Sequence, residues 1–312
     1  MSEEIFSREL DKFSPVRNFK RYIARKLLLN NSKKFLESND QLIVFSYDIV
    51  SHHINLDGFY EKEELDFIFS WFESLDKIRI EKLFGGNALD VGANIGNHSV
   101  YFSNFFKRVI SFEPHPRIFK LLELNSELKE NIEVHNFGIS NATNSSTLFF
   151  NNENMGASSL DSKGLEGSSK VSVELKKIDD LNEIGKVTFI KIDVEGHEHE
   201  VIKGSERLIL RDKPVIMFEQ FPSEFCNGSS QTIDLLKTFG YEKFAVMEEI
   251  PNLKIKKQKY LSVTIIYQIG ISFINIVTSL FLGKKNSLKI KKRFSQEHYQ
   301  FILALPEWIS DS

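Results

Sequence analysis

The stretch "ALDVGANIGNHS", residues 88–99, decides the fold. A short apolar run ends on an acid, Asp90, and Gly92, Asn94 and Gly96 follow within the next six positions. Glycine adopts positive φ angles and lets a ligand approach the backbone closely, so this pattern predicts a buried strand that turns tightly into a helix. Ligands of open parallel sheets bind outside the carboxyl ends of the strands. We therefore expect these four residues to bind a cofactor.

The next predicted strand also ends on an acid. Glu113 closes this strand in "VISFEPHP", about 20 residues after the glycine turn, where an acidic side chain can bind a ribose diol. A dinucleotide requires the pattern G-x-G-x-x-G, whereas three residues separate Gly92 from Gly96 and Asn94 takes the place of the middle glycine. The charge of Asp90 repels a pyrophosphate but suits a sulfonium. The residues therefore favour S-adenosylmethionine over NAD.

Strands and helices alternate from residue 88 onward. This alternation predicts a parallel sheet with helices on both faces. Further strands are expected at 147–150 and 170–175, with a polar loop between them. The segments 241–248 and 298–305 have the pattern of two more strands near the end of the chain.

The composition limits the class of protein. The chain has 312 residues, 41% of them hydrophobic, which suits one large α/β domain with additions. Its net charge of −3 gives no indication of nucleic-acid binding. The one cysteine, Cys226, excludes an internal disulfide and fits a reducing compartment, and the N-terminus has no secretory pattern. We therefore expect a cytoplasmic protein.

Four motifs together resemble a known family. They are "DGFYEKEEL", "LDVGANIGNHS", "SFEPHP" and "FIKIDVEGHEHEVIKGSE", within a region from about Asp57 to Glu219. In this order and spacing they are similar to the FkbM family of S-adenosylmethionine-dependent methyltransferases. The resemblance implies the class I methyltransferase fold, a Rossmann-like three-layer α/β sandwich whose seven-stranded, mostly parallel sheet has an antiparallel last strand. It also implies an acceptor hydroxyl, often on a sugar.

The resemblance assigns residues to the cofactor. Asp90, Gly92, Asn94 and Gly96 match the cofactor loop, and Glu113 matches the acid that binds the ribose. By their place after the third predicted strand, three more residues are expected to line the adenine: Asn136, Phe137 and Gly138.

The motif "KIDVEGHE" gathers acidic groups at the end of the fourth predicted strand. Its candidate catalytic residues are Asp193, Glu195, His197 and Glu198. A sugar hydroxyl is a poor nucleophile, so a nearby base assists it, and clustered carboxylates raise one another's pKa values. The alternative is structural, with Asp193 holding the strand end, Glu195 orienting the turn and Glu198 favouring the start of the next helix. Mg²⁺ also suits an acidic cluster, but we do not favour it and assign no metal ligand.

Four residues are expected on the acceptor side of the site. Glu219 closes the fifth strand, and Ser158 lies in the polar segment "NMGASS", 154–159. The alternative for both is a solvated polar position. Tyr60 and Glu61 match the family within a segment that forms a lid or a wall of the site. Their alternative is a packed tyrosine and a glutamate in the first turn of a helix.

Basic residues are concentrated near the end of the chain. No acidic residue lies between Pro251 and Ser295, whereas ten lysines and arginines do. The uncharged stretch 261–282 is about 33 Å long as a helix, enough to span a bilayer, but one crossing would separate the last two strands. We therefore expect a helical insertion that contacts the surface of an anionic membrane. Packing on the domain or on a second subunit is the alternative.

These observations predict three regions. An N-terminal helical region with a lid covers 1–80, the catalytic domain covers 81–250 and 297–312, and the basic and apolar helical insertion covers 251–296. The predicted function is S-adenosylmethionine-dependent O-methylation of a small-molecule or glycan acceptor, including a polysaccharide or lipid-linked precursor at the inner membrane face. An NAD-dependent oxidoreductase and a non-catalytic adenosyl-binding scaffold are the alternatives. The sequence assigns neither the acceptor nor the oligomeric state.

Overall fold

The structure, a computed structural model, describes residues 15–36, 40–46, 48–151, 154–160, 169–251 and 284–310. It divides into two compact units, Met1–Glu61 and Lys62–Ser312, which are described separately. The three regions predicted from the sequence stay a prediction. The uncharged stretch 261–282 lies outside the described residues.

The first unit contains two helices, α1 (Pro15–Leu36) and α2 (Ile49–Asp57), among its described residues. Asp48 caps the start of α2 by accepting a hydrogen bond from the amide of Ser51, and Gly58 ends the helix with a φ of 84°. The side chain of Asn31 on α1 donates to the backbone carbonyl of Leu56, which ties α1 to the end of α2.

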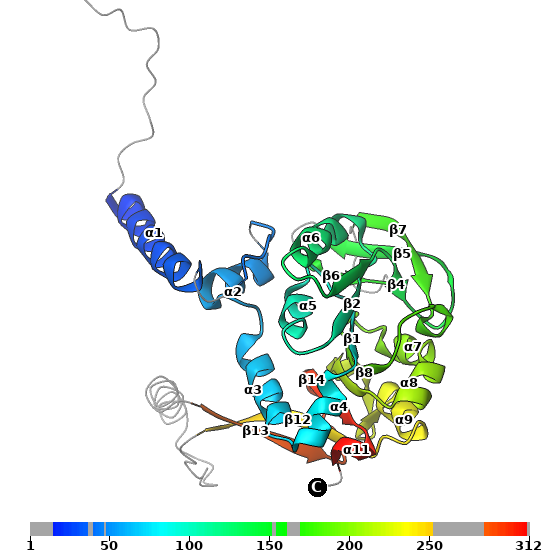
Figure 1. Ribbon diagram of the computed structural model, residues 1–312. Coiled ribbons are helices and arrows are strands. Elements are labelled where there is room, and N and C mark those ends of the chain that lie inside the picture. Colours follow the sequence, from blue (N-terminus) through cyan, green and yellow to red (C-terminus); the bar gives the residue numbers. More distant parts are fainter. Residues whose placement is uncertain are drawn as a thin grey trace, which may run out of the picture. The chain divides into compact units, whose positions relative to one another are not determined.

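The second unit alternates strands and helices along most of its length (Figure 1). Its helices and 3₁₀ turns are α3 (Lys62–Glu73), α4 (Lys77–Phe84), α5 (Asn97–Phe102), α6 (Pro116–Ser126), η1 (Ile178–Asp180), α7 (Glu198–Lys203), α8 (Glu206–Asp212), η2 (Pro222–Glu224), α9 (Gln231–Thr238) and α11 (Glu307–Ser310). Its strands are β1 (Asn87–Val91), β2 (Arg108–Phe112), β3 (Ile132–His135), β4 (Gly138–Ile139), β5 (Asn144–Asn151), β6 (Asn154–Ser159), β7 (Ser169–Lys176), β8 (Val187–Ile192), β9 (Val215–Gln220), β10 (Phe225–Cys226), β11 (Ser229–Ser230), β12 (Lys243–Pro251), β13 (Lys284–Lys291) and β14 (Tyr299–Leu305).

The main sheet has the strand order β13-β12-β14-β9-β8-β1-β2-β3 among the described residues. The strands from β9 to β3 run parallel to one another. β14 enters antiparallel between β9 and β12. This is the predicted class I methyltransferase arrangement, with β13 as an additional edge strand. The predicted fold is therefore confirmed.

Two segments differ from the sequence-based expectation. Residues 284–291, predicted as part of a helical insertion, form strand β13 and pair antiparallel with β12. Leu288 and Ile290 alternate with lysines there, and a period of two suits a strand rather than a helix. Residues 154–159, predicted as a polar loop, form strand β6. This strand pairs with β5 in a second sheet of order β4-β7-β5-β6, and the pairing satisfies its backbone.

The two faces of the main sheet bury different side chains. On one face, the ring of Phe189 lies 5.2 to 6.3 Å from those of Phe69, Phe72 and Phe102, which come from α3 and α5. On the other face, Ile190 belongs to a largely aliphatic cluster with residues of α7, α8 and α9. Figure 1 shows these three helices together on one side of the sheet and α3 and α4 on the other. Helices cover both faces, as expected for a buried parallel sheet.

We expect Phe69→Ala to lower the free energy of unfolding by about 3–5 kcal/mol, because it leaves a cavity among packed rings. Phe69 is 1% exposed, and neighbouring ring centroids lie 4.6 to 6.3 Å away. Ile78→Ala is the matched control, because Ile78 is 78% exposed and its loss should change the free energy by less than about 0.5 kcal/mol. Urea unfolding of both variants measures the difference, and equal losses would contradict the packing described.

Candidate active site

A buried ion pair lies under the carboxyl edge of the main sheet. Asp90 and Lys191 are register partners on β1 and β8, with side chains 0% and 3% exposed. The ammonium of Lys191 lies 3.1 Å from Oδ1 of Asp90 and 3.4 Å from Oδ2 of Asp193. It also donates a hydrogen bond of 2.8 Å to the carbonyl oxygen of Gly92. Asp90 is thus neutralised within the protein, and its predicted contact with a cofactor stays a prediction.

The sequence analysis did not assign Lys191. Its only signal is a lysine inside the apolar run "VTFIKI", the whole of which is buried as β8. A buried cation requires a partner, and the register of β8 against β1 supplies Asp90. A second buried contact supports the same carboxylate, because the hydroxyl of Ser99 on α5 donates to Oδ2 of Asp90 at 2.6 Å.

The glycine loop has the geometry that the sequence predicts. Gly92 has a φ of +76°, and a Cβ atom there would lie 1.8 Å from the carbonyl oxygen of Asp193. Gly96 has a φ of +90° at the start of α5, and a Cβ atom there would lie 2.8 Å from Leu122. Asn94, with a φ of 51°, completes the turn. The backbone that lies close to Gly92 is therefore that of Asp193, just after β8. This contact requires glycine at position 92 whether or not a ligand is bound.

Glu113 is held against this loop by two backbone amides. Its Oε2 accepts a hydrogen bond of 3.1 Å from the amide of Asn94, and its Oε1 accepts one of 2.7 Å from the amide of His115. Burial raises the pKa of Glu113 to about 7, although both amides and Lys191 act in the opposite direction. The structure therefore brings Glu113 to the glycine loop, and its contact with a ribose stays a prediction.

The three predicted adenine residues follow β3. The side-chain amide of Asn136 donates to the backbone carbonyl of Glu113 at 2.9 Å, which joins the ends of β2 and β3. Phe137 is 8% exposed, with its ring 5.5 Å from that of Phe112. Gly138 begins β4. All three lie next to Glu113 in the fold, and their contact with an adenine stays a prediction.

His115 is a site residue that the sequence analysis missed, although "SFEPHP" contains it. It is 3% exposed, and its Nδ1 accepts hydrogen bonds from the amides of Arg117 and Ile118 at the start of α6. The proton of a neutral ring is therefore on Nε2. Within the described residues this buried nitrogen has no hydrogen-bond partner. Buried donors are normally paired, so His115 is a candidate for contact with a ligand.

Carboxylates gather at the ends of β8 and β9. Asp193 and Glu219 share a hydrogen bond, and Glu195 lies close enough to both to affect their charges. Burial and then Asp193 raise the pKa of Glu195 to about 7, and the same two causes raise the pKa of Glu219. The raised pKa of Glu219 favours its protonated form, which can donate this hydrogen bond. The structure thus unites three residues that the sequence assigned to the catalytic and acceptor groups.

Glu198 and His197 have different surroundings. Glu198 is fully buried, and its Oε1 accepts hydrogen bonds from the amides of Val194 and Gly196 at 3.1 and 3.2 Å. Burial and then Glu224 raise its pKa to about 8. Glu198 therefore stabilises the turn between β8 and α7 from inside the protein. Nε2 of His197 lies 2.9 Å from the hydroxyl of Ser140, which follows β4. Catalytic roles for both stay predictions.

His298 is the third residue that the sequence motifs did not assign, after Lys191 and His115. It immediately precedes β14, and the antiparallel direction of that strand brings its start beside the end of β9. Nε2 of His298 lies 2.6 Å from Oε1 of Glu219, and its ring stacks on Phe221 at 5.2 Å and 11°. The side chain of His298 is 48% exposed, whereas that of Glu219 is 16% exposed. No sequence motif connects residues 79 positions apart, so only the strand order reveals this pair.

The remaining predicted acceptor residues come from other elements of the chain. Tyr60 and Glu61 belong to the first unit, where Glu61 has a φ of 57°. Ser158 lies on β6. The acceptor roles of all three stay predictions. No group of three or more histidine, cysteine or acidic side chains in the described ranges is arranged to hold a metal ion.

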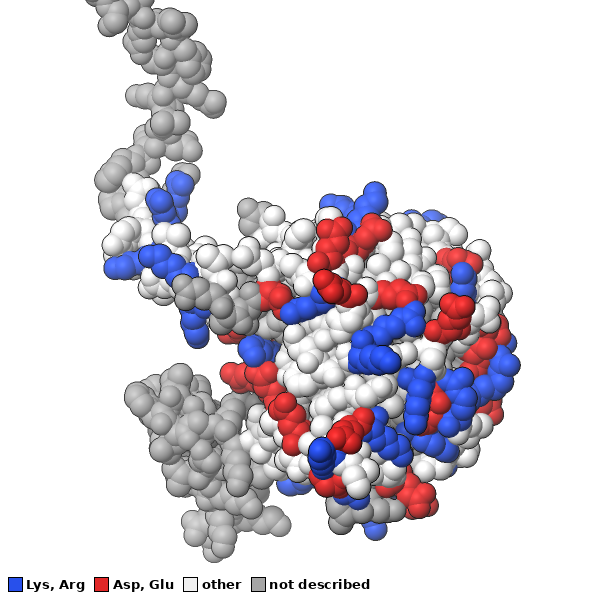
Figure 2. Space-filling model, in the orientation of Figure 1, with Lys and Arg blue, Asp and Glu red and all other residues white. Residues whose placement is uncertain are grey.

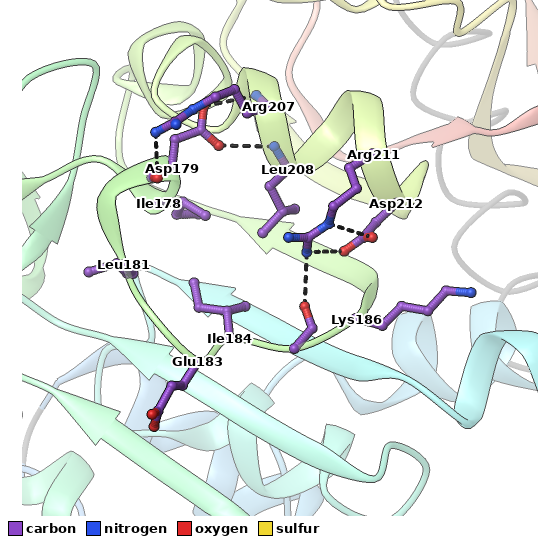
Figure 3. Close-up of a pocket in the computed structure, with 11 residues that line it drawn as sticks. Ile178, Asp179, Leu181, Glu183, Ile184, Lys186, Arg207, Leu208, Arg211 and Asp212 are labelled. Atoms are coloured by element: carbon purple, nitrogen blue, oxygen red, sulfur yellow. Dashed lines mark hydrogen bonds and ion pairs between the residues drawn. The ribbon is translucent and has the colours of Figure 1, made fainter.

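A pocket of about 650 Å³ opens where the amino ends of the parallel strands lie, opposite the candidate active site (Figure 3). It lies between the segment before β8 and helix α8. Asp179 accepts hydrogen bonds from the amides of Arg207 and Leu208, and Asp212 pairs with Arg211. β8 has six residues, so its two ends are about 20 Å apart. The pocket is therefore separate from the candidate active site.

The sequence model of the methyltransferase FkbM domain matches residues 90–243. The chain is also 32% identical over 117 residues to the hexuronic acid methyltransferase AglP of Haloferax volcanii, over 37% of this chain and 48% of that protein. It is 25% identical over 189 residues to methyltransferase 1 of Beauveria bassiana, over 53% of this chain and 74% of that protein. The first match thus spans about half the length of the relative.

A solved structure of methyltransferase FkbM from Methylobacillus flagellatus KT is 21% identical, with a TM-score of 0.33, over 49% of this chain and 36% of that one. The family match begins at Asp90, in the glycine loop, and continues through β8 and β9. The family that the motifs predicted is therefore confirmed for this region.

We expect Lys191→Met to lower the free energy of unfolding by about 3–5 kcal/mol, because it leaves the carboxylate of Asp90 buried without its cation. Lys186→Met is the matched control on the exposed approach to the same strand and should change the free energy by less than about 0.5 kcal/mol. The double variant Asp90→Asn/Lys191→Met should recover part of the loss. Urea unfolding checks all three, and a stable single variant would contradict the ion pair.

Proposed function

Because residues 90–243 form a methyltransferase FkbM domain, we propose that this protein transfers a methyl group from S-adenosylmethionine to a sugar hydroxyl of a glycan or of its precursor. The observation that carries this proposal is the joining of the glycine loop to the carboxylate cluster through Lys191. A nucleoside site and a site for proton acceptance therefore lie at one edge of one sheet.

The residues around the glycine loop fit an adenosine. Glu113 offers a carboxylate for a ribose diol, and backbone amides on both of its oxygens hold it in place. His115 offers a buried Nε2 donor beside it. We propose that Glu113 and His115 bind the nucleoside, with Asn94 and Asn136 positioning the Glu113 side chain and backbone.

The charge of the site fits a sulfonium better than a pyrophosphate. Asp193, Glu195 and Glu219 lie together at the ends of β8 and β9, and Lys191 is already paired with Asp90 and Asp193. A cation near these carboxylates favours their ionised forms, whereas a pyrophosphate would be repelled. This electrostatic balance supports S-adenosylmethionine against the alternative of an NAD-dependent oxidoreductase.

The acceptor is proposed from similarity and from charge. The relative in Haloferax volcanii is a hexuronic acid methyltransferase, which supports a glycan containing a hexuronic acid as the acceptor. A lipid-linked form of this glycan, and contact of the segment 251–296 with the inner membrane face, stay predictions from the basic composition of that segment. A cytoplasmic location is proposed because the single cysteine, Cys226, fits a reducing compartment.

We propose His298 as the base, positioned by Glu219. Nε2 of His298 forms a hydrogen bond of 2.6 Å with Oε1 of Glu219. Nδ1 is therefore the ring nitrogen that can accept a proton. Stacking on Phe221 holds the ring, and its half-exposed side chain can meet an acceptor from solvent. Glu195, with a pKa near 7, is the second candidate base. It lies nearer to Lys191 and Asp193, where its charge suits the sulfonium.

In this assignment each residue has one task. When bound, S-adenosylmethionine supplies an electrophilic methyl group, whose carbon–sulfur bond breaks as the acceptor oxygen bonds to the methyl carbon. Nδ1 of His298 takes the hydroxyl proton of the acceptor. Glu219 stabilises the resulting imidazolium by accepting a hydrogen bond from its Nε2 at 2.6 Å.

We expect the preference for S-adenosylmethionine over S-adenosylhomocysteine to rise with pH. The two ligands differ by the sulfonium charge, and Glu195 becomes anionic as the pH rises through about 7. The affinity ratio should increase about three- to tenfold between about pH 6 and pH 8. Isothermal titration measures both ligands, with NADH as a ligand that should not bind.

Glu195→Gln should flatten this pH dependence, whereas Glu206→Gln, an exposed matched control on α8, should keep it. Retention of the full pH dependence in Glu195→Gln would assign the titration to another carboxylate. Binding of NADH with the affinity of S-adenosylhomocysteine would remove the proposed cofactor.

We expect methyl transfer from S-adenosylmethionine to an oligosaccharide that contains a hexuronic acid. His298→Asn should lower kcat about 10²- to 10⁴-fold, because the general base is lost, while the affinity for S-adenosylhomocysteine stays within about threefold. His52→Asn, at an exposed histidine of the first unit, is the matched control. Radiolabelled methyl transfer measures the rates. A binding-competent wild-type protein that methylates no glycan would favour the scaffold alternative, and full activity of His298→Asn would leave Glu195 as the base.

A further inference from the structure

The first unit exposes most of the large apolar side chains that the described surface carries. Ten of them lie between residues 19 and 56: Phe19, Tyr22, Ile23, Leu27, Leu28, Leu29, Leu36, Ile43, Ile49 and Leu56. The much larger second unit adds five: Ile78, Leu124, Leu128, Leu210 and Ile290. In the described part of the first unit, Ser51, Gly58 and Phe59 are the buried residues. A unit of this size cannot bury an adequate core, so its apolar surface requires a partner.

Helix α1 carries the larger part of this surface together with positive charge. Its 22 residues include seven basic side chains and no acidic one. The basic residues are Arg17, Lys20, Arg21, Arg25, Lys26, Lys33 and Lys34. Figure 2 shows several basic side chains along α1. Such a helix is complementary to a surface that is both apolar and anionic.

One side of the first four turns of α1 is mainly apolar, and Leu28 lies among the arginines of the opposite side. Phe19, Ile23 and Leu27 are spaced by four residues and share one side of the helix, with exposed fractions of 65%, 40% and 60%. Arg21 and Arg25 lie on the other side. Lys26 and Tyr22 lie at the margin of the apolar side, with the ammonium of Lys26 5.9 Å from the centre of the ring. A long lysine there can extend its charge to the level of lipid headgroups.

We infer that α1 lies in the interface of an anionic membrane and holds the protein against it. The apolar side chains enter the boundary of the acyl chains, and the lysines and arginines contact anionic headgroups. A second copy of α1 is a poor partner for the same face, because seven positive charges on each helix repel one another. No helix in the described ranges is long and apolar enough to cross a membrane.

The test is co-sedimentation of the full chain with vesicles. Wild-type protein should bind vesicles of phosphatidylcholine with about 30% phosphatidylglycerol and bind pure phosphatidylcholine at least tenfold more weakly. Binding to the anionic vesicles should fall as the salt concentration rises from about 0.05 M to about 0.5 M. The measurement requires no methyl acceptor, so its outcome is independent of the proposed enzymatic function.

Two variants of α1 test separately how its charge and its apolar side contribute to vesicle binding. Lys20→Glu/Arg21→Glu/Arg25→Glu and Phe19→Ser/Ile23→Ser/Leu27→Ser should each lower vesicle binding at least tenfold. A matched triple reversal in the second unit, Lys77→Glu/Lys107→Glu/Lys170→Glu, uses exposed lysines and should keep binding within about twofold. Unchanged circular dichroism and urea unfolding of each variant show that the protein is still folded.

Three outcomes overturn the inference. The first is a wild-type protein that does not bind anionic vesicles at low salt. The second is vesicle binding that survives in both α1 variants, which would assign the contact to another segment. The third is a wild-type dimer in sedimentation velocity that the serine variant converts to a monomer without any effect on vesicle binding, which would make a second copy the partner of α1.

Discussion

The structure of the candidate active site depends on one buried ion pair. Asp90 and Lys191 face each other across two central strands, and neither side chain reaches solvent to any extent. Burial of two charges is unfavourable unless each is paired and hydrogen-bonded, and here Ser99, Asp193 and the carbonyl of Gly92 complete the set. The pair thus fixes the end of β1, the glycine loop and the end of β8 relative to one another. Loss of either charge would disturb all three.

From this pair a continuous series of charged groups crosses the edge of the sheet. Lys191 contacts Asp193, Asp193 shares a hydrogen bond with Glu219, and Glu219 contacts His298. The last two steps each cross to a neighbouring strand, from β8 to β9 and from β9 to β14, so the series extends from the glycine loop to the start of β14. Burial raises the pKa of Glu219 in this series and raises that of the nearby Glu195 to about 7. The same electrostatics suit a cationic methyl donor and an acceptor that must lose a proton.

Charge is unevenly divided between the parts of this chain. Seven basic side chains on α1 and ten between Pro251 and Ser295 contrast with a net charge of −3, so the rest of the chain is strongly acidic. An acidic catalytic region is repelled by an anionic bilayer, and a basic apolar helix provides the opposing attraction. The two proposals thus support each other physically, because an acceptor on a lipid carrier is most accessible to an enzyme held at that surface.

The sequence by itself determined the class of fold and the place of the glycine loop. Alternating apolar runs and helical periods specify the parallel sheet, and Gly92 and Gly96 occupy positions whose φ angles and close neighbours require glycine. These features are local, so a single sequence records them. The tertiary structure alone decided that Lys191 neutralises Asp90, that Glu198 supports its turn from beneath, and that residues 284–291 pair as a strand.

The pairing of His298 with Glu219 is the clearest example of a contact that only the tertiary structure decided. The two residues are 79 positions apart, and they meet only because β14 enters antiparallel beside β9. Contacts of this kind depend on strand order and register. These bring together residues that are far apart in the chain, so no motif of fixed spacing records the contact. Burial acts in the same way, because the pKa of a carboxyl group changes with what covers it rather than with its neighbours in the chain.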